Sequence, residues 1–170
     1  MQGAHTHANI PQFRDRIFVA AFLDFEKLEK FSFPGEVQLT KTIDSFVDRA
    51  AKVDEQFYYL SSSRYYDSLA HKMKDDTAIY RIDDSGVATR AWRICPTLKA
   101  NMGTYRDRVP ILRDIHGIRK ITPAECLALQ GFPKNFNFPD IPMGEIYKQL
   151  GNTVCVPVVM RIARRILAMD

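Results

Sequence analysis

The sequence has little cysteine, little glycine and no long apolar run. Its three cysteines, Cys95, Cys126 and Cys155, are far apart and include no C-x-x-C pair, which argues against a disulfide scaffold and for reduced thiols. The longest purely apolar run, Ile17 to Leu23, is far shorter than the ~20 residues that span a bilayer. The first residues lack the basic start and apolar core of a secretory signal. We therefore expect a cytoplasmic chain without a membrane partner.

The rest of the composition is ordinary for a globular protein. Eight glycines and nine prolines in 170 residues are too few for a low-complexity chain, and 46% of the residues are hydrophobic. This length predicts one domain or two small ones. The formal net charge of +4 is too small to identify a nucleic-acid partner by itself.

The distribution of the charge is more informative than its sum. Between Ser85 and Lys120 there are eight basic and two acidic residues, so this stretch carries +6 and the remainder of the chain −2. Aromatic and flexible residues lie among the cations, as in surfaces that contact a phosphate backbone and base edges. A solvated basic face is the alternative. The basic residues are Arg90, Arg93, Lys99, Arg106, Arg108, Arg113, Arg119 and Lys120.

The apolar run Ile17 to Leu23 predicts a strand covered on both faces, as in a parallel or mixed sheet. A buried helix is the alternative. The middle of the chain is irregular: residues 42–53 and 64–73 predict short helices, and residues 78–82 predict a strand.

The C-terminal part contains clearer signals for helix ends. Thr122-Pro123-Ala124-Glu125 is a capping box with proline at the first helical position, and Gly131 is expected to end this helix. Residues 145–150 predict another short helix, closed by Gly151. A last helix is expected to begin near Val156-Pro157.

Four segments, in this order, are similar to one enzyme family. They are Gln12-Phe13-Arg14-Asp15-Arg16, Cys95 to Thr104, Arg119 to Pro133, and Tyr147 to Val159. The first, third and fourth resemble motifs VIII, IX and X of the DNA (cytosine-5)-methyltransferases, and the second resembles the end of that family's target-recognition region. The resemblance runs from about Ile10 to Asp170.

The resemblance implies an α/β fold, with the edge of a Rossmann-like methyltransferase sheet and a small irregular α+β target-recognition domain. Residues 1–34 would belong to the catalytic domain, residues 35–133 would form the recognition domain, and residues 134–170 would return to the catalytic domain. It also implies double-stranded DNA as partner, S-adenosylmethionine as co-substrate, and the bacterial cytoplasm or nucleoid as location.

In this family a cysteine thiolate adds to C6 of a flipped cytosine, and C5 then takes the methyl group. A cation suits the charge that develops at the cytosine O2. The resemblance assigns this contact to Arg16, with Arg14 ordering the pocket. Two surface charges at a strand entry are the alternative. Against it, residues two apart on an extended chain point the same way.

The remaining assignments concern DNA and cofactor. The resemblance implies DNA-binding roles for a set of polar residues, of which Gln12 would brace the loop: Gln12, Thr97, Lys99, Arg106 and Arg108. It places S-adenosylmethionine beside Asn152, Thr153 and Val154, where a plain helix end is a compatible reading. We expect no metal site.

Three family motifs are absent from this sequence. There is no Phe-x-Gly-x-Gly turn, no Pro-Cys nucleophile pair and no Glu-Asn-Val. We therefore expect the chain to be inactive alone. A fragment or truncated gene, a subunit of a split methyltransferase, and a non-catalytic DNA-binding protein all remain open. Apolar surface left exposed would favour a complementary N-terminal methyltransferase chain or self-association.

Overall fold

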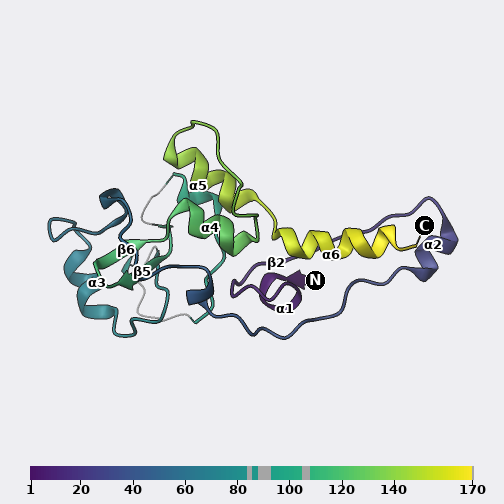
Figure 1. The fold of residues 1–170 in the computed structure, drawn as a ribbon, viewed down its shortest axis with the longest axis horizontal. Helices are drawn as coiled ribbons and strands as arrows, with labels where there is room; N and C mark the ends of the chain where they lie inside the picture. Colours follow the sequence, from purple (N-terminus) through teal and green to yellow (C-terminus); the bar gives the residue numbers. More distant parts are fainter. Residues whose placement is uncertain (84–85, 88–92, 105–107, 170) are drawn as a thin grey trace.

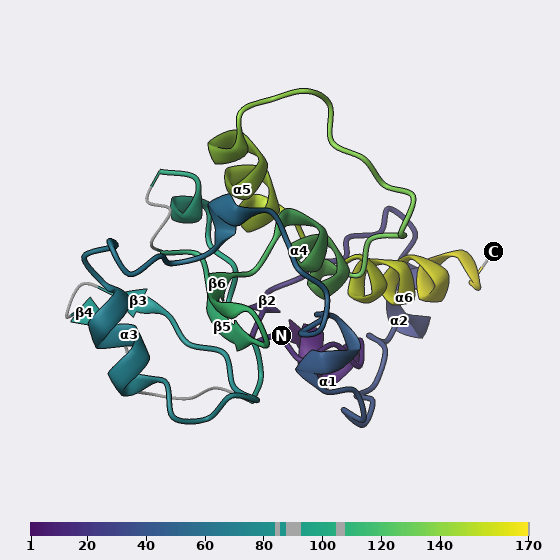
Figure 2. The same ribbon diagram turned by 60° about the vertical axis from the view of Figure 1, so that its left-hand side comes forward.

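The computed structural model describes residues 1–83, 86–87, 93–104 and 108–169. Short helices and strand pairs surround two hydrophobic cores (Figures 1 and 2). The α-helices are α1 (Ala4–His7), α2 (Phe25–Lys30), α3 (Tyr66–Lys72), α4 (Pro123–Gln130), α5 (Met143–Asn152) and α6 (Val156–Leu167). The 3₁₀ helices are η1 (Ile43–Ser45), η2 (Glu55–Phe57) and η3 (Ala100–Met102). The strands are β1 (Gln2–Gly3), β2 (Asp15–Arg16), β3 (Ile82–Asp83), β4 (Gly86–Val87), β5 (Ile111–Asp114) and β6 (Gly117–Lys120).

The strands pair only in antiparallel twos within the described residues: β1 with β2, β3 with β4, and β5 with β6. The β5–β6 hairpin turns where the Asp114 carboxylate accepts the backbone N–H groups of His116 and Gly117, at 2.8 and 2.9 Å. Gly117 has a φ of +146° there, which only glycine adopts at little cost. Tyr80 bridges to Ile111 and Tyr58 to Arg119, so the hairpin organises the middle of the chain.

The main core draws on all parts of the sequence, as Ile10, Leu112 and Leu150 illustrate. The second core, which includes Leu69 and Tyr80, lies wholly within residues 35–133. The domain boundaries at 34 and 133 remain a prediction.

The segment carrying α2 runs out and back beside α6, away from the rest of the molecule (Figure 1). Two arginines of α6 form hydrogen bonds to the segments that lie beside this helix. Arg161 donates to the carbonyl oxygens of His7 (2.6 Å) and Gly35 (2.9 Å), and Arg165 donates to the Ser32 hydroxyl at 2.9 Å.

The expected strand from Ile17 to Leu23 is wrong for the described residues. Only Asp15–Arg16 are paired, with β1, and in the apolar run beyond them alternate side chains are open to solvent while those between, such as Phe18, are half-buried. Ile17 is 80% exposed, Val19 86%, and Leu23 fully exposed. A strand is stabilised by hydrogen bonds to a neighbour, and no described strand lies beside this run. The edge of a Rossmann-like sheet is therefore not formed among these residues.

Two further helix predictions need correction. Residues 42–53 form only one helical turn, η1, because the Asp48 carboxylate accepts the N–H groups of Ala50 and Ala51 (2.8 and 3.1 Å) and favours a turn instead. Gly151 does not close α5 but lies inside it, and the helix ends at Asn152 with Thr153 as its cap.

The predictions for α3, α4 and α6 are confirmed. The Thr122 hydroxyl accepts the Glu125 N–H, and the Glu125 carboxylate accepts the Thr122 N–H at 2.7 Å, so both halves of the capping box form. Gly131 ends α4 in the left-handed conformation, and Pro157 lies in the first turn of α6. No helix in the described part of the chain is both long enough and apolar enough to cross a bilayer.

Candidate functional site

Arg14 is a buried guanidinium that joins distant segments of the chain. The residue is only 2% exposed to solvent. It donates to the carbonyl oxygens of Leu98 (2.8 Å) and Gly151 (3.0 Å), and also to that of Thr153. Burial lowers its pKa to about 10, and the nearby positive charge of Arg16 contributes to the same shift. Arg14 therefore ties the Cys95–Thr104 segment to the C-terminal end of α5.

Arg14 and Arg16 differ in their surroundings, although they are two residues apart. Arg16 is exposed, and its guanidinium donates to the Asp15 carbonyl oxygen at 2.7 Å. The interpretation of Arg14 and Arg16 as two surface charges is thus wrong for Arg14, because its guanidinium is buried. Arg16 remains available to a ligand.

Gln12, the member of the predicted DNA-binding set that would brace the loop, is fully buried. Its amide nitrogen donates to the Leu129 carbonyl oxygen at 2.7 Å, at the end of α4. The backbone on either side pairs with Cys95: the Phe13 N–H donates to the Cys95 carbonyl oxygen, and the Cys95 N–H to that of Pro11. This hydrogen bond joins the loop to α4 and fits the bracing role that the motif resemblance implies for Gln12, which stays a prediction.

Three of the predicted DNA-binding residues lie together in one cavity of about 170 Å³. These are Thr97, Lys99 and Arg108. The Thr97 hydroxyl donates to the Phe13 carbonyl oxygen, so Thr97 also connects this cavity to the Gln12–Arg16 segment. The cavity's other lining residues are Arg81, Ile82, Pro96, Asn101 and Pro110. Arg106, also predicted to bind DNA, lies outside the described residues.

The +6 of the basic stretch is not all surface charge. Arg119 is fully buried, Arg93 pairs with Asp75 at 3.0 Å, and Arg113 pairs with Asp76 at 3.0 Å. Arg90 lies outside the described residues. Among the described cations of this stretch, Lys99 and Arg108 are the two that line the cavity.

The cavity wall rests on α5 through close backbone contacts. A Cβ atom added at Gly151 would overlap the backbone of Lys99 and Ala100, and one added at Gly103 would overlap that of Gly144. Helix η3 therefore lies directly against α5, at a distance that only glycine allows. Sequence reasoning assigned Gly151 to a helix end and missed this role, because the contact joins residues about fifty positions apart.

The predicted cofactor segment follows α5 immediately. Asn152 is exposed and Val154 is 42% exposed, so both side chains can meet a ligand. The Thr153 carbonyl oxygen accepts a hydrogen bond from Arg14, which fixes the backbone between them. Thr153 also borders a small cavity of about 130 Å³ whose lining includes Phe132, Phe136 and Phe138.

A buried ion cluster, formed by Arg119, Asp114 and Glu125, supports the Arg119–Pro133 segment. The Arg119 Nε donates to Asp114 at 2.6 Å, and its two terminal nitrogens donate to Glu125 at 2.7 and 2.8 Å. Tyr58 donates its hydroxyl to Asp114 at 3.0 Å. Burial alone lowers the pKa of Arg119, but the two carboxylates outweigh it and raise the pKa overall. Arg119 therefore contributes to the charge of the basic stretch but not to its surface.

The three cysteines are free and buried. Burial raises the pKa of the Cys95, Cys126 and Cys155 thiols. A nucleophilic cysteine needs a lowered pKa and access to its substrate, so none of these thiols has the properties of a methyltransferase nucleophile.

Comparison with solved structures identifies the class of fold. The chain aligns with a Spodoptera frugiperda DNMT2 variant at a TM-score of 0.58 and 16% identity, covering 97% of this chain and 56% of that one. It aligns with the Dnmt2 methyltransferase of S. pombe at a TM-score of 0.56 and 17% identity, covering 95% and 54%. The fold is that of an α/β methyltransferase.

The sequence comparisons identify the family. The family profile described as C-5 cytosine-specific DNA methylase matches residues 5–168. The type II methyltransferase M.Bsp6I of Bacillus sp. strain RFL6 is 41% identical over 164 residues, which are 96% of this chain and 52% of the relative. M.NlaX of Neisseria lactamica is 31% identical, over 94% and 49%. The chain belongs to the C-5 cytosine-specific DNA methylase family, and it spans about half the length of these curated relatives.

Proposed function

We propose that this chain provides the target-recognition and C-terminal portion of a DNA (cytosine-5)-methyltransferase. The order of its motifs supports this assignment, as does its membership of the family. The observation that carries the proposal is the cavity that brings Lys99 and Arg108 together with Thr97. Cations in a concave site attract the DNA backbone, so double-stranded DNA is the proposed partner. The place of action is then the bacterial cytoplasm or nucleoid.

Arg16 contacts the flipped cytosine in this proposal. Its guanidinium is exposed, and the buried Arg14 holds the backbone two residues before it. Negative charge develops at the cytosine O2 as a thiolate adds to C6, and a fixed cation there lowers the barrier. Because the chain's own thiols are buried with raised pKa values, the attacking thiolate comes from elsewhere.

S-adenosylmethionine supplies the methyl group, and this chain contributes one wall of its site. The exposed side chains of Asn152 and Val154 would contact it, on a backbone that Arg14 fixes at Thr153. The remainder of that site is not in this sequence, which lacks the Phe-x-Gly-x-Gly turn.

A complementary N-terminal methyltransferase chain is the partner proposed for the exposed run after β2. Ile17 and Val19 are both at least 80% exposed, and this extended backbone has no described strand beside it. Extended apolar segments of this kind are completed by addition of a neighbouring strand.

Methyl transfer from labelled S-adenosylmethionine to duplex DNA tests the proposal. The 170-residue chain alone should transfer none, and adding a chain with the Pro-Cys and Phe-x-Gly-x-Gly motifs should restore transfer. Robust transfer by the chain alone would contradict the proposal. If the chain binds duplex DNA but no added chain restores methyl transfer, a non-catalytic DNA-binding protein is favoured.

The Arg16→Ala variant tests the pocket role in the complemented enzyme. It should lower the transfer rate by roughly 10²–10³-fold, the usual effect of removing one group that stabilises a developing charge, and change duplex binding much less. Arg164→Ala, on the exposed face of α6, is the control. Equal losses of rate and binding in Arg16→Ala would argue against a pocket role.

A further inference from the structure

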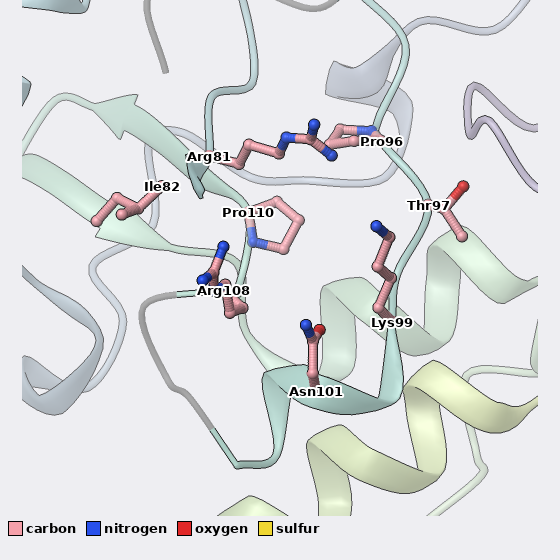
Figure 3. Close-up of a pocket in the computed structure, with 8 residues that line it drawn as sticks. All are labelled: Arg81, Ile82, Pro96, Thr97, Lys99, Asn101, Arg108 and Pro110. Atoms are coloured by element: carbon pink, nitrogen blue, oxygen red, sulfur yellow. The ribbon is translucent and has the colours of Figure 1, made fainter. Parts of the chain in front are cut away.

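The cavity beside the Cys95–Thr104 segment has an unusual lining. Three of its eight residues are cations, Arg81, Lys99 and Arg108, and none of the eight is acidic or aromatic. They come from three stretches of chain: Arg81 and Ile82, just before and at the start of β3, the Pro96–Asn101 segment, and the Arg108–Pro110 segment that leads into β5. Figure 3 shows the side-chain ends of Arg81, Lys99 and Asn101 around one space, with Pro110 and then Arg108 on its other side.

The chemistry of this lining fits an anion with several acceptor oxygens. Arginine presents a planar fork of donors and lysine a compact charge, while the Asn101 amide adds a neutral donor. No aromatic ring is available in the lining to stack on a base. Pro96, Pro110 and Ile82 are the apolar residues of the lining, and next to apolar groups the field of the cations is less screened by water.

The wall of the cavity is also held in place before any ligand arrives. Asn101 lies in η3, whose approach to α5 depends on Gly151 and Gly103. Two residues before Lys99, the Thr97 hydroxyl donates to the Phe13 carbonyl oxygen, and one residue before Lys99 the Leu98 carbonyl oxygen accepts a hydrogen bond from Arg14. Donors on such a fixed segment lose little conformational freedom on binding.

We propose that this cavity binds a single phosphodiester group of DNA, and that Arg81 and Asn101 are its ligands together with Lys99 and Arg108. The inference rests on the proposed DNA-binding function and deepens it. It adds Arg81 and Asn101 to the DNA-binding residues and gives the four side chains one shared role. Contacts to phosphate position a protein on the duplex without reading its sequence, so this site sets the register on DNA while other residues read the bases.

The salt dependence of duplex binding provides a direct test. Each neutralised phosphate contributes about 0.9 to the slope of log K against log salt concentration. Fluorescence anisotropy of the 170-residue chain with two duplexes of unrelated sequence would measure this slope. The Arg81→Ala variant should bind both duplexes more weakly by the same factor, up to about eightfold at 0.1 M salt, which is the share of one phosphate.

A double variant tests whether the cations share one phosphate. Removing Arg81 and Lys99 together should reduce the slope by about 0.9 in all, because a single phosphate is lost, whereas a reduction of about 1.8 would mean two separate phosphates. Arg164→Ala removes an equal charge from α6 and should leave the slope unchanged. Arg81→Lys keeps the positive charge on a similar aliphatic chain. It should keep the wild-type salt slope, whereas Arg81→Ala should reduce that slope. Thermal unfolding of each variant would verify that it is folded.

The possible outcomes separate the two proposals. If the wild-type chain does not bind duplex DNA, the proposed function fails. If the wild-type chain binds duplex DNA but Arg81→Ala and the double variant both keep the wild-type slope, only the phosphate site is wrong. A loss confined to one of the two sequences would show a base contact by Arg81 and would overturn the inference as well.

Discussion

At the scale of the residue, Arg119 is a full positive charge with no exposure to solvent, balanced by Asp114 and Glu125. Removing it leaves two buried carboxylates without their cationic partner. We expect Arg119→Ala to lower the free energy of unfolding by about 3–5 kcal/mol, measured by urea denaturation. Arg113→Ala removes a partly exposed arginine paired with the exposed Asp76 and should cost less than about 1 kcal/mol. Equal losses would mean that the buried cluster has no special importance.

The same scale shows why the site was only partly predictable. The resemblance identified Arg14 and Arg16, but not that one is enclosed and the other exposed. That difference depends on the carbonyl oxygens of Leu98, Gly151 and Thr153, which lie more than eighty positions away in the sequence. Arg81 had no local signal at all, since its role follows from proximity to Lys99 and Arg108.

At the scale of the element, the approach of η3 to α5 leads to another prediction. Glycine in a helix interior is normally less favourable than alanine by about 1 kcal/mol. Gly151→Ala should nevertheless destabilise this protein by about 1–3 kcal/mol, because the new Cβ would overlap the backbone of Lys99 and Ala100. It should also weaken DNA binding, since η3 forms part of the cavity wall. Thermal unfolding and anisotropy would measure the two effects.

Gly35→Ala is the matched control, because nothing lies within 4 Å of a Cβ at that position. It should leave stability and DNA binding nearly unchanged. A stabilised Gly151→Ala variant would show that η3 can move away from α5 without cost.

At the scale of the whole molecule, the open run after β2 is the proposed contact with a complementary chain. A charged residue on an edge strand opposes pairing with another strand. Val19→Lys should therefore reduce complementation of methyl transfer at least tenfold, if pairing loses ~1.4 kcal/mol or more, with DNA binding by the chain unchanged. Ile115→Lys introduces the same charge at another exposed apolar position (74% exposed) and should have little effect.

Sedimentation of the chain alone would test whether a second copy of this chain binds the run instead. If Val19→Lys abolishes self-association but leaves complementation intact, the run binds a second copy rather than a complementary chain, and the proposed partner is wrong.

The sequence by itself determined the elements whose signals are local. The capping box at Thr122 and Glu125, the left-handed Gly131 and the proline in the first turn of α6 all act within about one helical turn, so adjacent residues are enough to define them. The ordered motifs likewise indicated the family. The tertiary structure alone decided which charges are buried, that Arg81 joins Lys99, and that Gly151 supports the cavity. It also left Ile17 to Leu23 unpaired, because a strand depends on a neighbour and not on its own residues.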